Sequence, residues 1–328
     1  MGADAYLDIV NKSKLIDFLR TFRTGDFRRF REFLDSPYFN KRDDVRQFYA
    51  VLLNLAPDFH DPKLEREALW EKYAPDRPYD RKELNYVANF LLQLAENYIA
   101  TERFQQDDTS RNSEVLGYCL LNGLDKHYRS AYQKSEKALH AEPYRDADWQ
   151  INAWRLAALE MQNFYMSRSR RADLSIHKVV EHLDTFYLDK KLELSSEILN
   201  LNQILSDKFD TSFIKDLSLL LKDRDASTTS IIEIRRFVLY ILLDPEDVAS
   251  FHRLRELLPL ARRVYPPERV TGIFGYAQNF CIRRIKAGDT SFELELFNIY
   301  KESIESKVMF GTGYLIHWDL KNVCSVAL

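Results

Sequence analysis

The residues that most suggest metal chemistry are His177 and His182, which flank Glu181 in a helical pattern. Zinc-binding helices place two histidines four residues apart, so that both side chains reach one ion. Here the histidines are five apart, and at about 100° per residue their side chains lie about 140° apart around a helix. The spacing predicts no metal site, and we interpret both as surface or groove histidines.

Other catalytic motifs are incomplete. Gly311 and Gly313 form a lone G-x-G that lacks the third glycine of the dinucleotide fingerprint and the strand before it. No phosphate-binding loop or nucleophile elbow occurs. Cys119, Cys281 and Cys324 have no paired histidine that would make a nucleophile. We expect no catalytic residue and no cofactor, and therefore no enzyme; an enzyme with an unfamiliar site is one alternative.

Arginine clusters raise a second alternative, the binding of nucleic acid or of a phosphate ligand. One cluster is Arg168, Arg170 and Arg171, at a predicted helix end where arginines also stabilise the helix dipole. The other is interleaved with acidic residues, as on a solvated face, and consists of Arg20, Arg23, Arg28, Arg29 and Arg31. Nucleic-acid binding needs uncompensated positive charge on one face, and the net charge is −3, so nucleic acid is a disfavoured partner.

Aromatic residues are the remaining candidates for recognition. Trp149 and Trp154 lie on one predicted helix. Most aromatic residues must pack between helices, but Trp and Tyr also dominate the hot spots of binding surfaces. Together with Arg168, Arg170 and Arg171, the two tryptophans are the binding residues that the sequence suggests.

Composition indicates the fold that positions these residues. Only 9 glycines and 10 prolines occur in 328 residues, which is typical of long helices with short joints and argues against an all-β fold. The three cysteines support neither a disulfide framework nor a zinc site. No secretory leader and no apolar run of about 20 residues is present. We expect a cytoplasmic protein with no membrane partner.

The clearest pattern lies at 173–206, which predicts two helices joined tightly at Asp189 and Lys190. Each expected helix has an apolar stripe at helical spacing: Val179, Val180, Leu183, Phe186 and Tyr187 in the first, and Leu194, Ile198, Leu201 and Leu205 in the second. Helices this short are marginal alone, so each needs a neighbour. This antiparallel hairpin is the expected building unit of the chain.

The N-terminal region, 1–105, is expected to be a separate helical region. Thr24 or Asp26 is the expected cap of its second helix, and Pro37 should end that helix. Tyr38 and Phe39 should then pack back on the helix. Further helices are expected at 43–52, 63–73 and 81–104, and the polar stretch 105–113 is the expected boundary.

The rest of the chain, 106–328, is expected to be a repeat region. Helices are expected near 114–122, 125–141, 147–167, 175–188, 191–206, 210–222, 228–243, 246–264, 267–286, 290–306 and 313–328. The motifs beginning at Asp244-Pro245 and at Tyr265-Pro266 should each start a helix. Pairing these helices gives units of roughly 35–45 residues, the period of α-solenoids.

A resemblance follows from these patterns. The spacing F-x-x-F-L-x-S-P-Y-F-N at 30–40, followed by a helical array, resembles a group of bacterial helical-repeat proteins. The part at 125–328 resembles degenerate tetratricopeptide repeats, without their regular small residues. The resemblance implies a TPR-like α-solenoid that binds a peptide or protein on a concave surface, in a chain that continues beyond this one.

The last expected helix, 313–328, stops in the middle of its apolar stripe. A solenoid end needs a polar cap, so we expect either a truncated chain or self-association through this uncapped helix. The sequence therefore predicts an all-α, right-handed α-solenoid of antiparallel helix pairs after a distinct N-terminal region. Its predicted function is a non-enzymatic scaffold for protein or peptide interaction.

Overall fold

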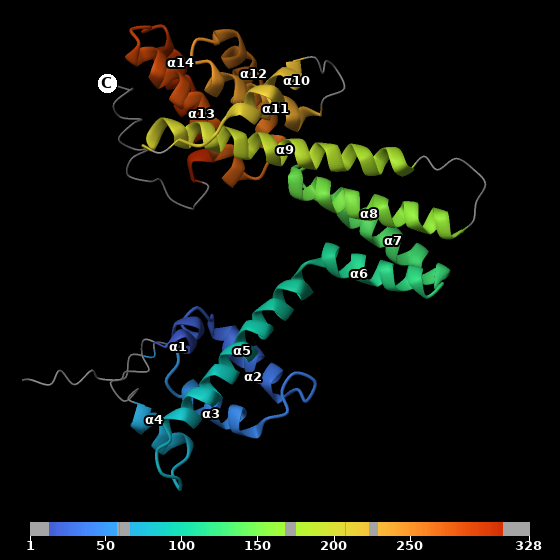
Figure 1. The fold of residues 1–328 in the computed structure, drawn as a ribbon, viewed down its shortest axis with the longest axis vertical. Helices are drawn as coiled ribbons and strands as arrows, with labels where there is room; N and C mark the ends of the chain where they lie inside the picture. The colour runs from blue at the N-terminus through green and yellow to red at the C-terminus, as the bar shows by residue number, and fades with distance from the viewer. Residues whose placement is uncertain are drawn as a thin grey trace, which may run out of the picture. The chain divides into compact units, whose positions relative to one another are not determined.

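The computed structural model describes residues 13–57, 59, 66–167, 175–206, 208–222 and 229–310. These residues form α-helices joined by turns, with no strand among them, which confirms the all-α prediction (Figure 1). By its internal contacts the chain divides into two compact units, Met1–Arg111 and Asn112–Leu328. No described helix is long and apolar enough to cross a membrane.

The first unit is organised around one long helix. Its helices are α1 (Lys14–Leu19), α2 (Thr24–Asp35), α3 (Asp43–Leu53), α4 (Arg66–Tyr73) and α5 (Arg81–Gln106). Each of the four shorter helices contacts α5 (Figure 1). The apolar side of α5 is buried and carries Leu84, Val87, Leu91, Leu94, Ala95 and Tyr98. The ring of Phe30, on α2, lies between Tyr49 of α3 and Tyr98 of α5, at centroid distances of 4.9 and 5.3 Å.

The SPYFN segment closes α2 through a side-chain tether. Asn40 is 2% exposed; its amide donates to the carbonyl oxygens of Leu34 (3.0 Å) and Arg42 (3.1 Å), and its Oδ1 accepts the Arg42 backbone amide. Phe39 stacks on Phe33 at 4.1 Å, as expected. The expectation for Tyr38 is wrong, because its side chain is 86% exposed.

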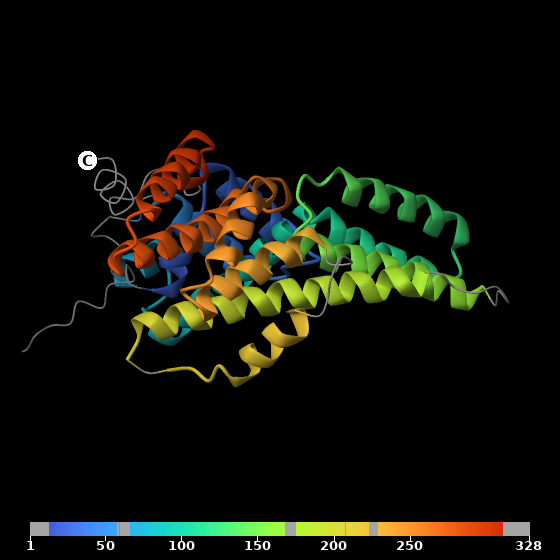
Figure 2. The ribbon, with the colours of Figure 1, turned by 90° about the horizontal axis from the view of Figure 1, so that it is seen from above.

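The second unit contains a succession of helices in chain order. They are α6 (Asp108–Leu121), α7 (Asp125–Ala141), α8 (Ala147–Met166), α9 (Ser175–Ile204), α10 (Ser212–Lys222), α11 (Ser230–Leu243), α12 (Val248–Val264), α13 (Pro267–Lys286) and α14 (Phe292–Glu305), followed by the short 3₁₀ helix η2 (Val308–Phe310). From α7 onward each helix packs on the next, with one exception. The helix α9 packs on α11 and not on α10, and α10 contacts α11. Figure 2 shows α10 set to the side of α9.

Bonds between distant parts of the chain close this unit. The Arg145 backbone amide donates to the carbonyl of Val264, at the end of α12 (3.0 Å). Arg269, in the first turn of α13, pairs with Asp146 (2.8 Å) and Asp148 (2.7 Å) at the start of α8. Asp146 also caps α8 by accepting the Trp149 amide. The start of α8 is therefore held against the α12–α13 joint.

The hairpin predicted at 173–206 is wrong: α9 is one continuous helix of 30 residues (Figure 1). No glycine or proline lies between Tyr187 and Leu194, so the backbone has no reason to leave the helix there. Asp189, expected in the joint, is instead fully buried and bonded to α11. The two expected stripes are parts of one stripe.

Three expected boundaries also differ. Neither Thr24 nor Asp26 is the cap of α2: the cap is Arg23, and Thr24 is the first helical residue. Asp26 is the third residue, and its carboxylate accepts the Arg23 backbone amide at 2.8 Å. The stretch 105–113, expected as a polar break, is mostly helical, since α6 begins at Asp108, but the division between the two units, after Arg111, lies within it. Asp244 and Pro245 form a turn, and α12 begins later, capped by Asp247, which accepts the Ser250 amide. The expected helix at 313–328 lies outside the described residues.

Candidate functional site

The sequence-predicted tryptophans lie within the helix packing of the second unit. The Trp149 indole Nε1 donates to the Leu139 carbonyl at the end of α7 (2.9 Å). The Arg145 guanidinium lies over one side of its ring at 4.8 Å, and the His182 ring meets it edge-on at 5.6 Å. Trp154 is half-buried, and its buried Nε1 has no hydrogen-bond partner among the described residues. The Trp149 side chain therefore serves contacts between helices in this structure.

The two histidines are not brought together. His177 is exposed, whereas His182 is half-buried and shares a 2.8 Å hydrogen bond with Gln150 of α8. Burial lowers the pKa of His182, which favours its neutral form. Within the described ranges no group of three His, Cys, Asp or Glu side chains could hold a metal ion. Cys281 is buried, and burial raises the pKa of its thiol to about 12, which disfavours the reactive thiolate at neutral pH.

The arginine clusters have different outcomes. Arg168, Arg170 and Arg171 lie outside the described residues. In the first unit, three arginines pair with nearby acids: Arg20 with Asp17, Arg28 with Glu32, and Arg29 with Asp26 and Glu102. That face therefore carries charges of both signs.

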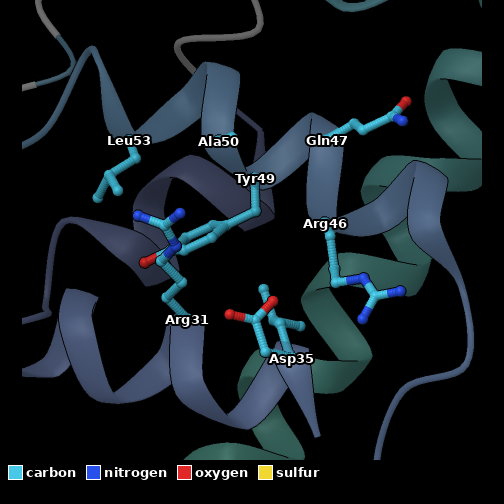
Figure 3. Close-up of a pocket in the computed structure, with 8 residues that line it drawn as sticks. Arg31, Asp35, Arg46, Gln47, Tyr49, Ala50 and Leu53 are labelled. Carbon is cyan, nitrogen blue, oxygen red and sulfur yellow. The ribbon is translucent and has the colours of Figure 1, made fainter. Parts of the chain in front are cut away.

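A shallow hollow of about 220 Å³ lies between α2 and α3 in the first unit. Figure 3 shows Arg31 and Asp35 reaching it from α2, and Tyr49 and Leu53 from α3, while Gln47 points outward. The Tyr49 hydroxyl is already used, since it donates to the Phe27 carbonyl (2.9 Å), and burial raises its pKa. Typical ligand sites have volumes of about 300 Å³ or more, so this hollow is smaller than most of them. Its lining carries charges of opposite sign, from Arg31 and Arg46 and from Asp35. We therefore do not assign it as a binding site.

A clear departure from ordinary packing is an apolar stripe on the outer side of α9. We call it the α9 stripe; its side chains are each between 42% and 60% exposed, and they are Ile176, Val180, Leu183, Tyr187 and Leu194. Their spacings of three, four and seven residues place them within about 40° of Tyr187 around the helix. They therefore form one continuous line.

The opposite side of α9 is the side that packs. The residues there are about 140–180° from Tyr187, and Thr185, Asp189, Leu192 and Ser196 are all buried. This buried side packs against α8 and α11 (Figure 2). Three of these four residues are polar, so α9 buries small polar side chains and exposes large apolar ones. This arrangement reverses the usual polarity of a surface helix.

A buried ion pair fixes this orientation. Asp189 Oδ1 accepts from Arg235 Nε of α11 (2.9 Å) and from the Tyr265 hydroxyl (2.6 Å), and all three side chains are at most 3% exposed. The Arg235 guanidinium also lies over the Tyr265 ring and pairs with Glu193 at 2.9 Å. Burial raises the pKa of Tyr265 well above its ordinary value, so its hydroxyl remains a donor. Turning the α9 stripe inward would expose Asp189 and strip Arg235 of its partner, which is costly.

The sequence patterns predicted apolar stripes that include Val180, Leu183, Tyr187 and Leu194 but not Ile176, and they assigned these residues to the interior of a hairpin. The available signal was the lack of a break between Tyr187 and Leu194, which favours one helix. The pairing of Asp189 with Arg235 and Tyr265 has no local signal, because those partners lie 46 and 76 residues away.

Comparison with known proteins finds no family model, no curated protein and no solved structure that matches this chain.

Proposed function

We propose that this protein is a non-enzymatic interaction scaffold that binds a protein partner along the α9 stripe. The observation that carries the proposal is the reversed polarity of α9. Five large apolar side chains stand in line on its outer face while Thr185, Asp189 and Ser196 are buried beneath. Contiguous exposed apolar surface on a folded protein marks interaction sites.

The geometry of the stripe indicates the kind of partner. From Ile176 to Leu194 the line is about 27 Å long, at 1.5 Å per residue. A straight apolar line with anchors at Val180, Tyr187 and Leu194 fits an amphipathic helix laid alongside it, which supplies its own apolar residues at helical spacing. We therefore expect the partner to present an apolar helix face.

The surrounding fold is proposed to be a right-handed, TPR-like α-solenoid of antiparallel helix pairs. Its support is the succession of contacts from α7 to α14, in which each helix packs on the next apart from the displacement of α10. Repeat arrays of this kind present long surfaces to partners. The free, buried Cys119 and Cys281 support a reducing, cytoplasmic location.

Site-specific photocrosslinking in cells that make the protein tests this function. A benzophenone amino acid at position 194, on the stripe, is expected to form a crosslink to a second polypeptide. The matched control is position 294, since Leu294 is 67% exposed but lies on α14 and not on the α9 stripe. A crosslink from 194 and none from 294 supports the proposal. No crosslink from 194, or equal products from both positions, overturns it.

A further inference from the structure

We infer that the partner of the α9 stripe is a second copy of this chain, bound with its α9 antiparallel to the first. The inference rests on the proposed function and names its partner. The evidence is the self-complementarity of α9 in spacing and in charge. This surface differs from the segment 313–328, through which the sequence predicts self-association.

Spacing allows the register that we propose. In a two-fold pair, if residue i faces residue j, then j faces i. If Leu183 lies opposite the second copy's Leu194, then Leu194 lies opposite the second copy's Leu183. Both stripe leucines of each copy are then covered in one interface. The same register places Ile176 opposite the second copy's Leu201, which is half-buried at the inner end of the line.

Charge selects the antiparallel orientation. Asp184 and Lys191 lie seven residues apart on the same flank of the stripe, about 40–60° from Tyr187. In the antiparallel register, this flank of one copy faces the same flank of the other copy, and the two run in opposite directions. Asp184 of each copy therefore lies beside Lys191 of the other. Charges flanking an apolar seam in this way decide partner and orientation. A parallel pair would instead set Lys190 and Lys191 of both copies at one level, where like charges repel.

Within the part of the chain that the structure describes, no ion pair neutralises these two charges. Among the described residues, Asp184 has no ion-pair partner, and Lys191 has none either, although its Nζ lies 4.3 Å from the ring centroid of Phe213. The neighbouring Lys190 is already paired with Glu193 at 3.1 Å. Asp184 and Lys191 are thus the charges on this flank that remain open to a partner.

One polar residue on the other flank is compatible with the pairing. The register brings Glu197 near the second copy's Val180. The Glu197 carboxylate accepts a hydrogen bond from the Tyr276 hydroxyl of α13 (3.2 Å), which draws it toward its own chain. The seam can therefore close without burying an unpartnered carboxylate.

The interface is small, which sets the concentration for the test. The 26 residues of helix from 176 to 201, about 38 Å long and about 10 Å wide, cover roughly 400 Å² per copy. That is about half the area of a standard stable interface. Sedimentation velocity of the full chain from about 1 to 100 µM is expected to show a monomer–dimer equilibrium in the micromolar range.

Substitutions separate the stripe from general surface effects. Leu183→Glu and Leu194→Glu should each abolish the dimer up to 100 µM, whereas the matched Leu294→Glu should leave it intact. Asp184→Lys should weaken the dimer about tenfold, and Asp184→Lys combined with Lys191→Asp should restore it. A chain that stays monomeric at 100 µM, or a dimer that Leu294→Glu abolishes and Leu194→Glu does not, overturns the inference.

Disulfide trapping tests the orientation. In a Cys324→Ser background, a mixture of the Leu183→Cys and Leu194→Cys chains should form the mixed disulfide, since Cys119 and Cys281 are buried. Leu183→Cys alone should not crosslink to itself. Self-crosslinking of Leu183→Cys without the mixed product indicates a parallel pair and overturns the inference.

The photocrosslink at position 194 separates this inference from the proposed function. A product with the mass of two chains supports both. A product that contains a different protein supports the scaffold function and overturns the second copy. Failure to crosslink overturns both.

Discussion

The helices α5 and α9 have similar lengths, 26 and 30 residues, and both carry an apolar stripe, but they use it in opposite ways. In α5 the stripe faces inward, and Leu91 and Val87 are fully buried against the helices around it. In α9 the stripe faces outward, and Asp189 and Ser196 are fully buried instead. An apolar stripe thus shows that a helix needs a covering surface, but not that the covering surface belongs to the same chain.

Asp189 should give the largest effect, because it holds α9 in its reversed orientation. Asp189→Leu leaves Arg235 buried without its main partner, at a cost of about 3–5 kcal/mol to the second unit. Peptide-resolved hydrogen exchange in urea should show lost protection in α9 and α11 and little change in α5. Adding Arg235→Met should recover much of the loss, since an apolar pair replaces the ions. Equal protection in Asp189→Leu and in the control Glu181→Leu would contradict the role assigned to the pair.

The same truncation in the two stripes compares them directly. Leu91→Ala in α5 removes a fully buried side chain and should cost about 2–5 kcal/mol. Leu194→Ala in α9 alters a side chain that is 60% exposed in the single chain, and should cost less than about 0.5 kcal/mol at concentrations where the chain is monomeric. The measurement is hydrogen-exchange protection of each helix. A large loss from Leu194→Ala in the monomer would show that its own chain covers the stripe.

Ser196 probes how tightly the small polar side of α9 is packed. Ser196→Leu should cost about 1–3 kcal/mol through overpacking against neighbouring helices. Ser196→Ala should be neutral or slightly stabilising, because the buried Oγ has no hydrogen-bond partner among the described residues. Thermal unfolding of both variants beside Tyr187→Leu, a change on the outer face, checks this. Tolerance of leucine at 196 would mean that this side is open.

The smallest expected effect is a pH dependence of the stability of α9, which arises from Glu193. Burial disfavours its carboxylate, but the charges of Arg235 and Lys190 outweigh burial, so the pKa of Glu193 lies below its ordinary 4.5. A lowered pKa in the folded state contributes stability above about pH 4.5 that is lost as the pH falls through the folded value. Protection of α9 should therefore decline below pH 4.5 more in the parent chain than in Glu193→Gln. Identical pH profiles of the parent chain and of Glu193→Gln would show that the charge of Glu193 does not stabilise α9.

Local rules explain why much of the fold was predictable. The prolines and capping residues placed several boundaries closely, as at Pro267, the first residue of α13. The 3.6-residue spacing located the described helices from α7 onward to within a few residues, except that it divided α9 into two. They misplaced α12, because Asp244 and Asp247 are both competent caps three residues apart and only tertiary packing chooses between them. The candidate binding residues were harder, since Trp149 is as suited to packing between helices as to binding.

By itself the sequence determined that this chain is helical, because few turn residues interrupt its apolar stripes. It also determined that the segment from Ser175 to Ile204 is apolar along one line. Only the tertiary structure decided which way that line faces. The deciding interaction is the pairing of Asp189 with Arg235 and Tyr265. A buried charge needs a partner, and the partner can lie far away in the sequence. The local spacing of apolar residues therefore does not predict such a pair.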